Sequence, residues 1–396
     1  MVAEQIQEAK KMYAEKNFVR ALELYETIRD FDADLFQKKC KFNYMWCLYR
    51  VKLWGEGAFD GPSETETKEH VRFIMENQTN ADLLYQFTVM RVLKHFKKKP
   101  NFEAGKINSW LDKLDPALLS DKSSSAERNG KMESYPSNKE EWYALKTKAL
   151  EKMECYDECI RISQEALECF QEFHYGNDIW FKRRIAISKY KLGDPQGALD
   201  ILQAILRVKQ DWFIYQDISE IYRTLGDFKA ALSYSIDSMM KAGDDDKKVN
   251  VLWDIAGLLE QMDQGNDGRA FKDYSVKLRI ENDWKLSREI DTYYRSRKEH
   301  IDGTSLQTIQ RTVVSTCEKY KWEEKPLELG VVQRILDNGK AGFIKSNSAS
   351  YYFRFNEFKG RRSDIKEGLR VQFYVEKSFD NKKNCDSFCA VNIKPK

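Results

Sequence analysis

Basic side chains that could contact phosphate groups are concentrated near the C-terminal end of the chain. Residues 330–396 contain 14 Lys and Arg against 7 Asp and Glu, which gives this segment a net charge of +7. The whole chain of 396 residues carries only +3, so the residues before this segment are slightly acidic in sum. A basic surplus confined to one segment predicts a module there that binds nucleic acid.

The sequence contains no set of residues with the spacing of a catalytic or metal site. The four histidines lie outside His-Glu-x-x-His and Ser-centred motifs, and no glycine-rich phosphate loop occurs. Cys155 and Cys159, or Cys385 and Cys389, are separated by three residues without a second matching pair, which is a weak zinc pattern. We therefore predict that the protein is not an enzyme and that it needs neither a metal nor a cofactor.

The basic segment has the alternating pattern of short β-strands joined by turns. In residues 369–376, Val371 and Phe373 point to one side and Tyr374 to the other, so one face of this strand is apolar. Asn338-Gly339 supplies residues that tolerate positive φ and therefore favours a hairpin turn. Four or five such strands are predicted between residue 330 and the C-terminus.

The order and spacing of these strands resemble the cold-shock domain. In that family the first strand leads through Lys-Gly-x-Gly-Phe-Ile into a strand Val-Phe-Val-His-Phe, and this chain has Lys340-Ala-Gly-Phe-Ile and Tyr351-Tyr-Phe-Arg-Phe. The resemblance covers nearly all of residues 330–396. It implies a five-stranded oligonucleotide-binding (OB) barrel that binds single-stranded RNA or DNA. It also implies that Phe343, Tyr352 and Phe355 stack on bases.

The chain departs from the family pattern at three positions. Arg334, Ala341 and Arg354 stand where the family usually has Trp, Phe and His, so flat rings are lost and two arginines are gained. A guanidinium group both stacks on bases and pairs with phosphate, which offsets part of that loss. The basic residues expected around the same face and its adjoining loop are Arg334, Arg354, Lys340, Lys345, Arg361 and Arg362. In the alternative interpretation, the barrel is architectural or binds only protein.

Residues 1 to about 300 have the three-and-four spacing of successive amphipathic helices. Lys16-Asn-Phe-Val-Arg-Ala, Leu192-Gly-Asp-Pro-Gln-Gly-Ala and Leu225-Gly-Asp-Phe-Lys-Ala-Ala share a turn, a small residue and an apolar helix. This pattern resembles the tetratricopeptide repeat, in which a small residue lets the two helices of a hairpin pack closely. Ala198 and Ala231 are 33 residues apart, and weaker copies centre on Ala21, Cys159 and Ala270.

Stacked helical hairpins leave a concave groove lined by the first helix of each pair, and such grooves usually bind protein. The repeat register predicts that the groove is lined by Trp180, Arg183, Tyr190, Phe213, Gln216, Glu220 and Arg223. Trp180 and Phe213 are equally consistent with packing between repeats. We therefore expect Arg183, Gln216, Glu220 and Arg223 to contact a protein partner.

The fold class expected from these patterns is multidomain, α then β. An α-solenoid of TPR-like hairpins in residues 1–325 is followed by a small five-stranded cold-shock-like barrel in residues 330–396, with a flexible loop near residues 120–138. No long apolar segment or signal peptide is evident, which favours the cytoplasm. The expected function is that of an adaptor that binds single-stranded nucleic acid, RNA in preference to DNA, and a protein partner. The alternative is a scaffold or regulator that binds protein only.

Overall fold

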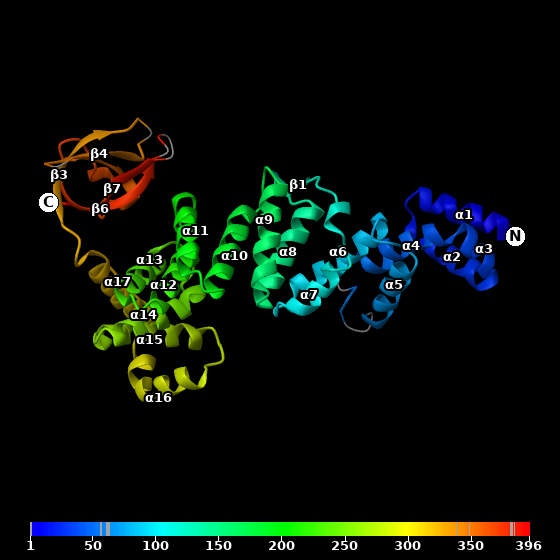
Figure 1. Cartoon of the computed structure of the whole chain (residues 1–396), viewed down its shortest axis with the longest axis horizontal. Helices are drawn as coiled ribbons and strands as arrows, with labels where there is room; N and C mark the ends of the chain where they lie inside the picture. The colour runs from blue at the N-terminus through cyan, green and yellow to red at the C-terminus, as the bar shows by residue number, and fades with distance from the viewer. Residues whose placement is uncertain are drawn as a thin grey trace. The chain divides into compact units, whose positions relative to one another are not determined.

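A computed structural model describes residues 2–55, 58–60, 64–337, 339–347, 349–380, 383 and 385–396 (Figure 1). The chain divides into two compact units, Met1–Gly193 and Asp194–Lys396. Each unit is considered separately below.

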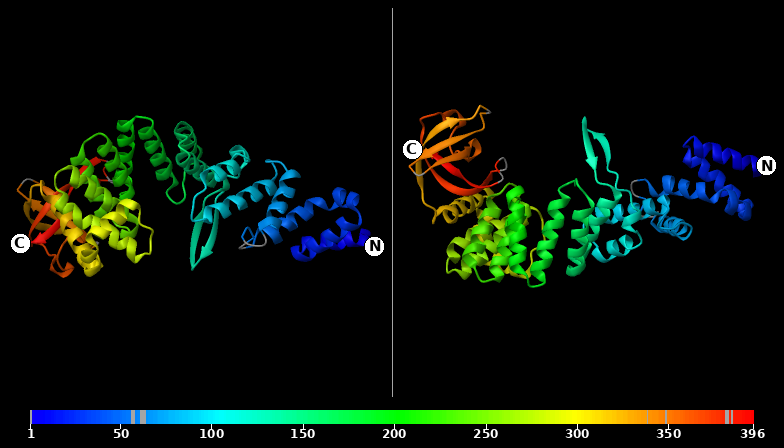
Figure 2. Two further views of the ribbon diagram at one scale, coloured as in Figure 1. Left: turned by 90° about the horizontal axis from the view of Figure 1, so that it is seen from below. Right: turned by 45° about the horizontal axis from the view of Figure 1, so that its top comes forward.

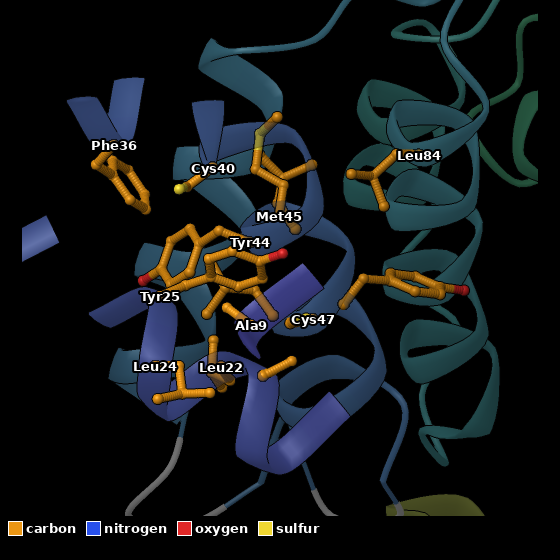
Figure 3. Close-up of a cluster of buried hydrophobic side chains, with 14 of the residues drawn as sticks. Ala9, Leu22, Leu24, Tyr25, Phe36, Cys40, Tyr44, Met45, Cys47 and Leu84 are labelled. Carbon is orange, nitrogen blue, oxygen red and sulfur yellow. The ribbon is translucent and has the colours of Figure 1, made fainter. Parts of the chain in front are cut away.

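The first unit is helical apart from one hairpin. Its elements are α1 (Val2–Ala14), α2 (Phe18–Phe31), α3 (Ala33–Lys39), α4 (Lys41–Leu48), the π-helix η1 (Tyr49–Leu53), α5 (Glu64–Glu76), α6 (Leu83–Lys98), α7 (Ala104–Leu111), the 3-10 turn η3 (Pro116–Leu118), β1 (Ser124–Arg128), β2 (Lys131–Tyr135), α8 (Asn138–Lys152), α9 (Tyr156–Cys169) and α10 (Asn177–Lys191). Helices α1 to α6 share an apolar core (Figure 3). Tyr25 is fully buried in it, and its hydroxyl accepts a hydrogen bond of 3.2 Å from Asn43 Nδ2. The buried hydroxyl is therefore satisfied within this core.

The second unit contains helices followed by five strands. Its helices are α11 (Pro195–Val208), α12 (Trp212–Thr224), α13 (Phe228–Met240), the 3-10 turn η4 (Asp245–Lys248), α14 (Val249–Gln261), α15 (Gly265–Glu281), α16 (Arg288–Gly303) and α17 (Leu306–Trp322). Its strands and short turns are β3 (Glu328–Ile335), β4 (Ala341–Ser346), β5 (Ser350–Arg354), η5 (Phe355–Glu357), η6 (Arg362–Asp364), β6 (Arg370–Asp380) and β7 (Cys385–Pro395). The strands close into a barrel in the order β3-β4-β5-β7-β6, and β5 pairs with β7 in parallel.

The turns of the helical hairpins share one backbone conformation. After α1, α8, α10, α12 and α14, the second residue beyond the end of the helix has a positive φ: 61° at Lys16, 60° at Glu154, 89° at Gly193, 79° at Gly226 and 60° at Asp263. A left-handed residue after the helix end is the usual way to terminate a helix sharply. Only two of the five are glycine, which explains why the sequence signature is strong in two copies and weak in the others.

The second helix of each hairpin places a small residue four positions after its N-cap residue. Ala21, Cys159, Ala198 and Ala231 occupy this position, and all four are fully buried. In the last hairpin this position belongs to Gly268.

The expected copy centred on Ala270 was therefore misplaced by two residues. A Cβ atom at Gly268 would lie 3.1 Å from the carbonyl oxygen of Ala256 and 3.3 Å from its Cα atom, so α15 approaches the backbone of α14 at this point. A glycine is needed here because the approach leaves no room for a side chain. Hairpins built in this way make the helical part a TPR-like repeat array.

The segment near residues 120–138, where we expected a flexible loop, contains a β-hairpin. Strands β1 and β2 pair in antiparallel register, with Asn129 (φ 53°) and Gly130 (φ 73°) between them. Two central residues with positive φ are what a two-residue type I′ hairpin turn requires. Figure 2 shows the hairpin projecting from the helices of its unit. Asn129 and Gly130 therefore form a hairpin turn inside the segment that we expected to be a flexible loop.

The change from helix to strand occurs between Trp322, the last residue of α17, and Glu328, the first residue of β3. The compact units divide elsewhere, so helices α11 to α17 and the barrel belong to one unit. Separate folding of residues 1–325 and 330–396 stays a prediction. The turn expected at Asn338 lies partly outside the described residues. Across the described ranges, no helix is both long and apolar enough to cross a bilayer.

Candidate nucleic-acid interface

One outward-facing row of side chains runs across all five strands of the barrel. Arg334 on β3 lies opposite Phe343 on β4, Phe343 opposite Tyr352 on β5, Tyr352 opposite Cys389 on β7, and Cys389 opposite Glu376 on β6. Residues that are directly opposite in neighbouring strands point to the same face of a sheet. The residues that alternate with them face a buried interior that includes Ile344 and Phe353. The register therefore gathers two aromatic rings and one arginine that are far apart in the sequence.

A β-bulge places Arg334 in this row. Val332 pairs with Ile344 of the interior, but the register then shifts, so that Arg334 and not Gln333 lies opposite Phe343. Strict alternation from Val332 would have turned Arg334 toward the interior. An extra residue on one strand re-aims the side chains that follow it.

The two aromatic rings in the row contact each other edge to face. The ring centroids of Phe343 and Tyr352 are 5.8 Å apart, with 70° between the ring planes. Both side chains are half buried, so part of each ring is open to solvent. Two partly exposed rings on neighbouring strands form the kind of platform on which unstacked bases bind.

Exposed basic side chains flank the rings on the same face. Lys345 is two residues from Phe343 on β4, and Arg354 is two residues from Tyr352 on β5, so alternation directs them outward with the rings. Within the described part of the chain, Arg334, Lys345 and Arg354 form no ion pair. Among the described residues, no carboxylate is paired with these three charges.

The remaining residues expected at this face lie outside the row. Phe355 follows the end of β5, and its ring is stacked on the fully buried Phe353 with 5.7 Å between centroids and 21° between planes. Through this contact Phe355 packs against the barrel core. It also lies one residue beyond the end of β5, so it is not part of the row. Arg361 and Arg362 lie in the connection between β5 and β6, and Arg361 Nε is 3.3 Å from Asp364 Oδ2. Lys340 precedes β4, and its carbonyl accepts the backbone N–H of Phe355.

The β6 side of the barrel is covered by helix α17. The indole of Trp322 stacks on the ring of Tyr374 with centroids 4.6 Å apart, and Lys321 Nζ and Lys325 Nζ each lie 2.9 Å from Glu376 Oε1. Lys321 also pairs with Asp237 of α13. Because Glu376 is the last residue of the row, the helices close one end of the outward face.

The charges at this docking contact shift the pKa values of both main partners. Burial alone would raise the pKa of Glu376, but Lys321 and Lys325 outweigh it and hold the pKa below its ordinary value. Burial alone would lower the pKa of Lys321, but Asp237 and Glu376 outweigh it and raise the pKa. Glu376 and Lys321 are therefore both charged at neutral pH and form an ion pair at this contact. No sequence pattern indicated this contact, since Trp322 has the spacing of an ordinary helix residue.

The residues expected to bind protein lie on two helices. Gln216, Glu220 and Arg223 follow one another on α12, where Gln216 Nε2 donates a hydrogen bond of 2.8 Å to Asp254 Oδ2 on α14. Burial and the nearby Glu220 raise the pKa of Asp254, while Arg223 opposes the shift. The first helices of two successive hairpins thus share a polar cluster.

The fourth of these residues belongs to the first unit. Arg183 lies on α10, with its guanidinium carbon 5.7 Å from the ring centroid of Trp180. Trp180 and Phe213 are both half buried, in keeping with the packing interpretation of these rings. Among the described residues, no group of three or more His, Cys, Asp or Glu side chains could hold a metal ion.

Comparison with known proteins gives structural similarity without close sequence relatives. No protein-family model matches the chain, and no curated protein matches it. Among solved structures, the Rap conjugation gene regulator of plasmid pLS20, in complex with the Phr* peptide, superposes with a TM-score of 0.42 at 12% identity, covering 82% of this chain and 86% of that one. The apo form of the quorum sensor NprR from B. thuringiensis superposes with a TM-score of 0.42 at 13% identity, covering 81% of this chain and 96% of that one.

A thermophilic TPR protein of Thermus thermophilus is also similar, with a TM-score of 0.22 at 12% identity, covering 65% of this chain and 99% of that chain. These overall similarities are too low to carry an argument about function. The function proposed below therefore rests on the residues of this chain.

Proposed function

We propose that this protein is an adaptor whose C-terminal barrel binds single-stranded nucleic acid, with RNA favoured, and whose helical repeats bind a protein partner. The observation that carries the proposal is the alignment of Arg334, Phe343 and Tyr352 across three neighbouring strands. The strand order of the barrel, with its parallel pairing of β5 and β7, supports an OB-type fold of the cold-shock kind.

In the proposed complex, Phe343 and Tyr352 stack on successive bases. Each stacked base contributes about 1–3 kcal/mol, and every base offers a flat face, so binding depends little on sequence. The bases of a duplex already stack on each other, so only an unpaired strand gains from these rings. Arg334 extends the platform at one end because its planar guanidinium group stacks on bases and pairs with phosphate.

The flanking charges supply the contacts with the phosphate backbone. Lys345 and Arg354 project from the same face as the rings, and they are exposed. Binding of such groups to phosphates releases counterions and therefore weakens as salt increases. The face combines stacking, which is insensitive to salt, with charge contacts, which are sensitive to it.

The polar cluster on α12 and α14 is the proposed place for the protein partner. Gln216, Glu220, Arg223 and Asp254 combine amide, acidic and basic groups on the first helices of adjacent hairpins. Such a mixture suits a peptide segment or a helix of a partner, whose backbone and charged side chains it can pair. Arg183 lies on α10 of the other unit and is proposed separately as a residue that contacts protein.

A second candidate function is that of a regulator whose barrel binds only protein. It is favoured by the stacking of Trp322 on Tyr374, which uses one part of the outer barrel face for a contact with protein. An aromatic face that docks one helix of this chain could dock a helix of another.

Binding of the full chain to fluorescent oligonucleotides distinguishes the two candidates. Matched single-stranded RNA, single-stranded DNA and duplex are titrated at several salt concentrations. The adaptor proposal expects single strands to bind more tightly than duplex, RNA to bind at least as tightly as DNA, and affinity to fall with salt. Absence of binding to any oligonucleotide at low salt would favour the regulator that binds only protein.

A further inference from the structure

Three side chains of the first unit form a chain of two hydrogen bonds. Glu140 Oε2 is 2.7 Å from His174 Nδ1, and His174 Nε2 is 2.9 Å from Ser134 Oγ. A hydroxyl within reach of an imidazole that is itself oriented by a carboxylate is the arrangement that activates a serine as a nucleophile. Ser134 and His174 are 40 positions apart in the sequence, and Glu140 and His174 are 34 apart. No local sequence motif could therefore have revealed this arrangement.

Glu140 is held in place by the start of helix α8. Ser137 is the N-cap residue, and its hydroxyl accepts the backbone N–H of Glu140 at 3.1 Å. The Glu140 side chain is directed to other donors, because its Oε1 atom accepts from the backbone N–H of His174 and from Asn177 Nδ2, each at 2.8 Å. Glu140 is only 1% exposed. The carboxylate is therefore fixed in a dry site with a donor for each oxygen.

This carboxylate determines the tautomer of His174. An ionised carboxylate only accepts hydrogen bonds, so Nδ1 carries the proton and donates it to Glu140. In neutral His174 the Nε2 atom is then the acceptor, and Ser134 donates its hydroxyl proton to it. This is the direction in which a general base must receive the proton of a nucleophile.

The backbone after His174 fixes the imidazole in this orientation. Tyr175 and Gly176 both have positive φ, at 53° and 71°, and α10 begins at the next residue. The sharp turn lets the backbone N–H and the ring of His174 reach the same carboxylate. The base is thus positioned by three contacts on one rigid segment.

We propose that Ser134 is an acyl acceptor that reacts with activated esters carrying a small apolar acyl group. Ser134 is exposed on β2, and Met132, which alternation places on the same face, is 70% exposed and offers an apolar surface for that group. Ser134 is the nucleophile, His174 the general base, and Glu140 a positioning residue. This activity is independent of the binding functions proposed above, and it departs from the expectation, drawn from sequence motifs alone, that the protein is not an enzyme.

The reaction balances without an added oxidant or metal. Ser134 Oγ attacks the ester carbonyl carbon and forms a new C–O bond while its proton moves to His174 Nε2. The bond from the carbonyl carbon to the leaving oxygen breaks, and the proton passes from His174 to that oxygen. The products are acyl-Ser134 and an alcohol or phenol, and water can later release the acid and restore the serine.

The test uses the full chain with p-nitrophenyl acetate, stopped-flow absorbance for p-nitrophenolate, and peptide mass spectrometry for the acetylated residue. Ser125 is the matched control because it lies directly opposite Ser134 on β1 and is also exposed, and because His174 Nε2 is hydrogen-bonded to Ser134 and not to Ser125. We expect a burst of one equivalent with the acetyl group on Ser134. Ser134→Ala and His174→Ala should slow the burst by at least about 100-fold, which is the usual scale of general base catalysis, and Ser125→Ala should leave it unchanged.

A second readout separates positioning from folding. The imidazole Nδ1 proton should give a downfield proton NMR resonance in the parent and in Ser134→Ala, and Glu140→Gln should move it upfield while slowing the burst. Thermal unfolding of each variant checks that the fold is kept. The proposal is overturned if the acetyl group appears equally on Ser125, if Ser134→Ala reacts as fast as the parent, or if no burst occurs. The contact would then only anchor the hairpin.

Discussion

The indole of Trp322 is stacked on the ring of Tyr374, with 4.6 Å between the ring centroids and 18° between the ring planes. The last helix of the array therefore packs against the outside of the barrel. Trp322 is buried at this contact. Lys321 of α17 and Lys325, which follows the helix, both lie over its ring and pair with Glu376. The barrel is thereby docked to the helices of its own unit.

Replacement of Trp322 by Ala should loosen this docking. The exposed residues Glu323 and Glu324 join α17 to the barrel, so a glutamate-specific protease should cleave there faster in Trp322→Ala than in the parent. Trp284→Ala is the control, since Trp284 is 41% exposed and lies outside this contact. A released C-terminal fragment that resists further digestion would support independent folding of the barrel. Equal cleavage rates in all three proteins would mean that the stack does not hold the barrel.

The ion pair of Glu376 should make the stability of this unit depend on acid pH. The folded pKa of Glu376 is depressed, so its stabilisation is present above the unfolded value and is lost as the pH falls through the folded pKa. Glu376→Gln should therefore lower the free energy of unfolding by about 1–3 kcal/mol at neutral pH, and by less in acid. Urea unfolding at several pH values measures this. Asp337→Asn is the control, because Asp337 is exposed in a turn of the barrel. Its free energy of unfolding should stay close to that of the parent at every pH.

Gly268 and Gly257 form a matched pair for testing the repeat register. Gly268→Ala should destabilise the protein by about 1–3 kcal/mol, because the added Cβ meets the backbone of Ala256. Gly257→Ala, in α14, meets nothing within 4 Å and should stabilise it by about 0.5–1 kcal/mol through helix propensity. Thermal unfolding compares the two. Opposite signs confirm the close approach of α15 to α14, and a stabilising Gly268→Ala would refute it.

The proposed protein site should respond to charge reversal. Arg223→Glu and Arg183→Glu, used as full-length baits with a partner identified by cross-linking, should each weaken binding about tenfold, which corresponds to about 1.4 kcal/mol. Arg288→Glu is the control, because Arg288 is exposed at the start of α16 and lies outside the polar cluster on α12 and α14. Unchanged recovery with Arg223→Glu would rule out the polar cluster on α12 and α14 as the interface, and unchanged recovery with Arg183→Glu would rule out α10.

The sequence predicted the features that depend on local periodicity. Alternation in residues 369–376 correctly put Val371 and Phe373 in the barrel core and Tyr374 outside, because one buried face imposes a period of two. The small residues at Ala198 and Ala231 were placed correctly for the same kind of reason, since each sits at a fixed distance from its turn.

Features that depend on tertiary contact were not predictable in this way. The bulge that turns Arg334 outward cannot be recognised from the alternation of residues along the strand. Gly268 has the residue type of a turn, although it lies where α15 approaches α14. Trp322 looks like any apolar residue of a helix until the barrel packs on it. Phe355 followed the family pattern in sequence but lies beyond the end of its strand.

The most direct test of the account is the affinity of the full chain for a single-stranded RNA when Phe343, Tyr352 or Lys345 is replaced by Ala. Loss of either ring should cost about 1–3 kcal/mol and leave the salt slope unchanged, because stacking releases no counterions. Loss of Lys345 should instead reduce the slope of log affinity against log salt by about 0.7. Phe388→Ala is the control, since Phe388 is an exposed ring on β7 outside the row. If Phe343→Ala and Tyr352→Ala bind RNA as tightly as the parent and as Phe388→Ala, the rings only pack and the central claim is wrong.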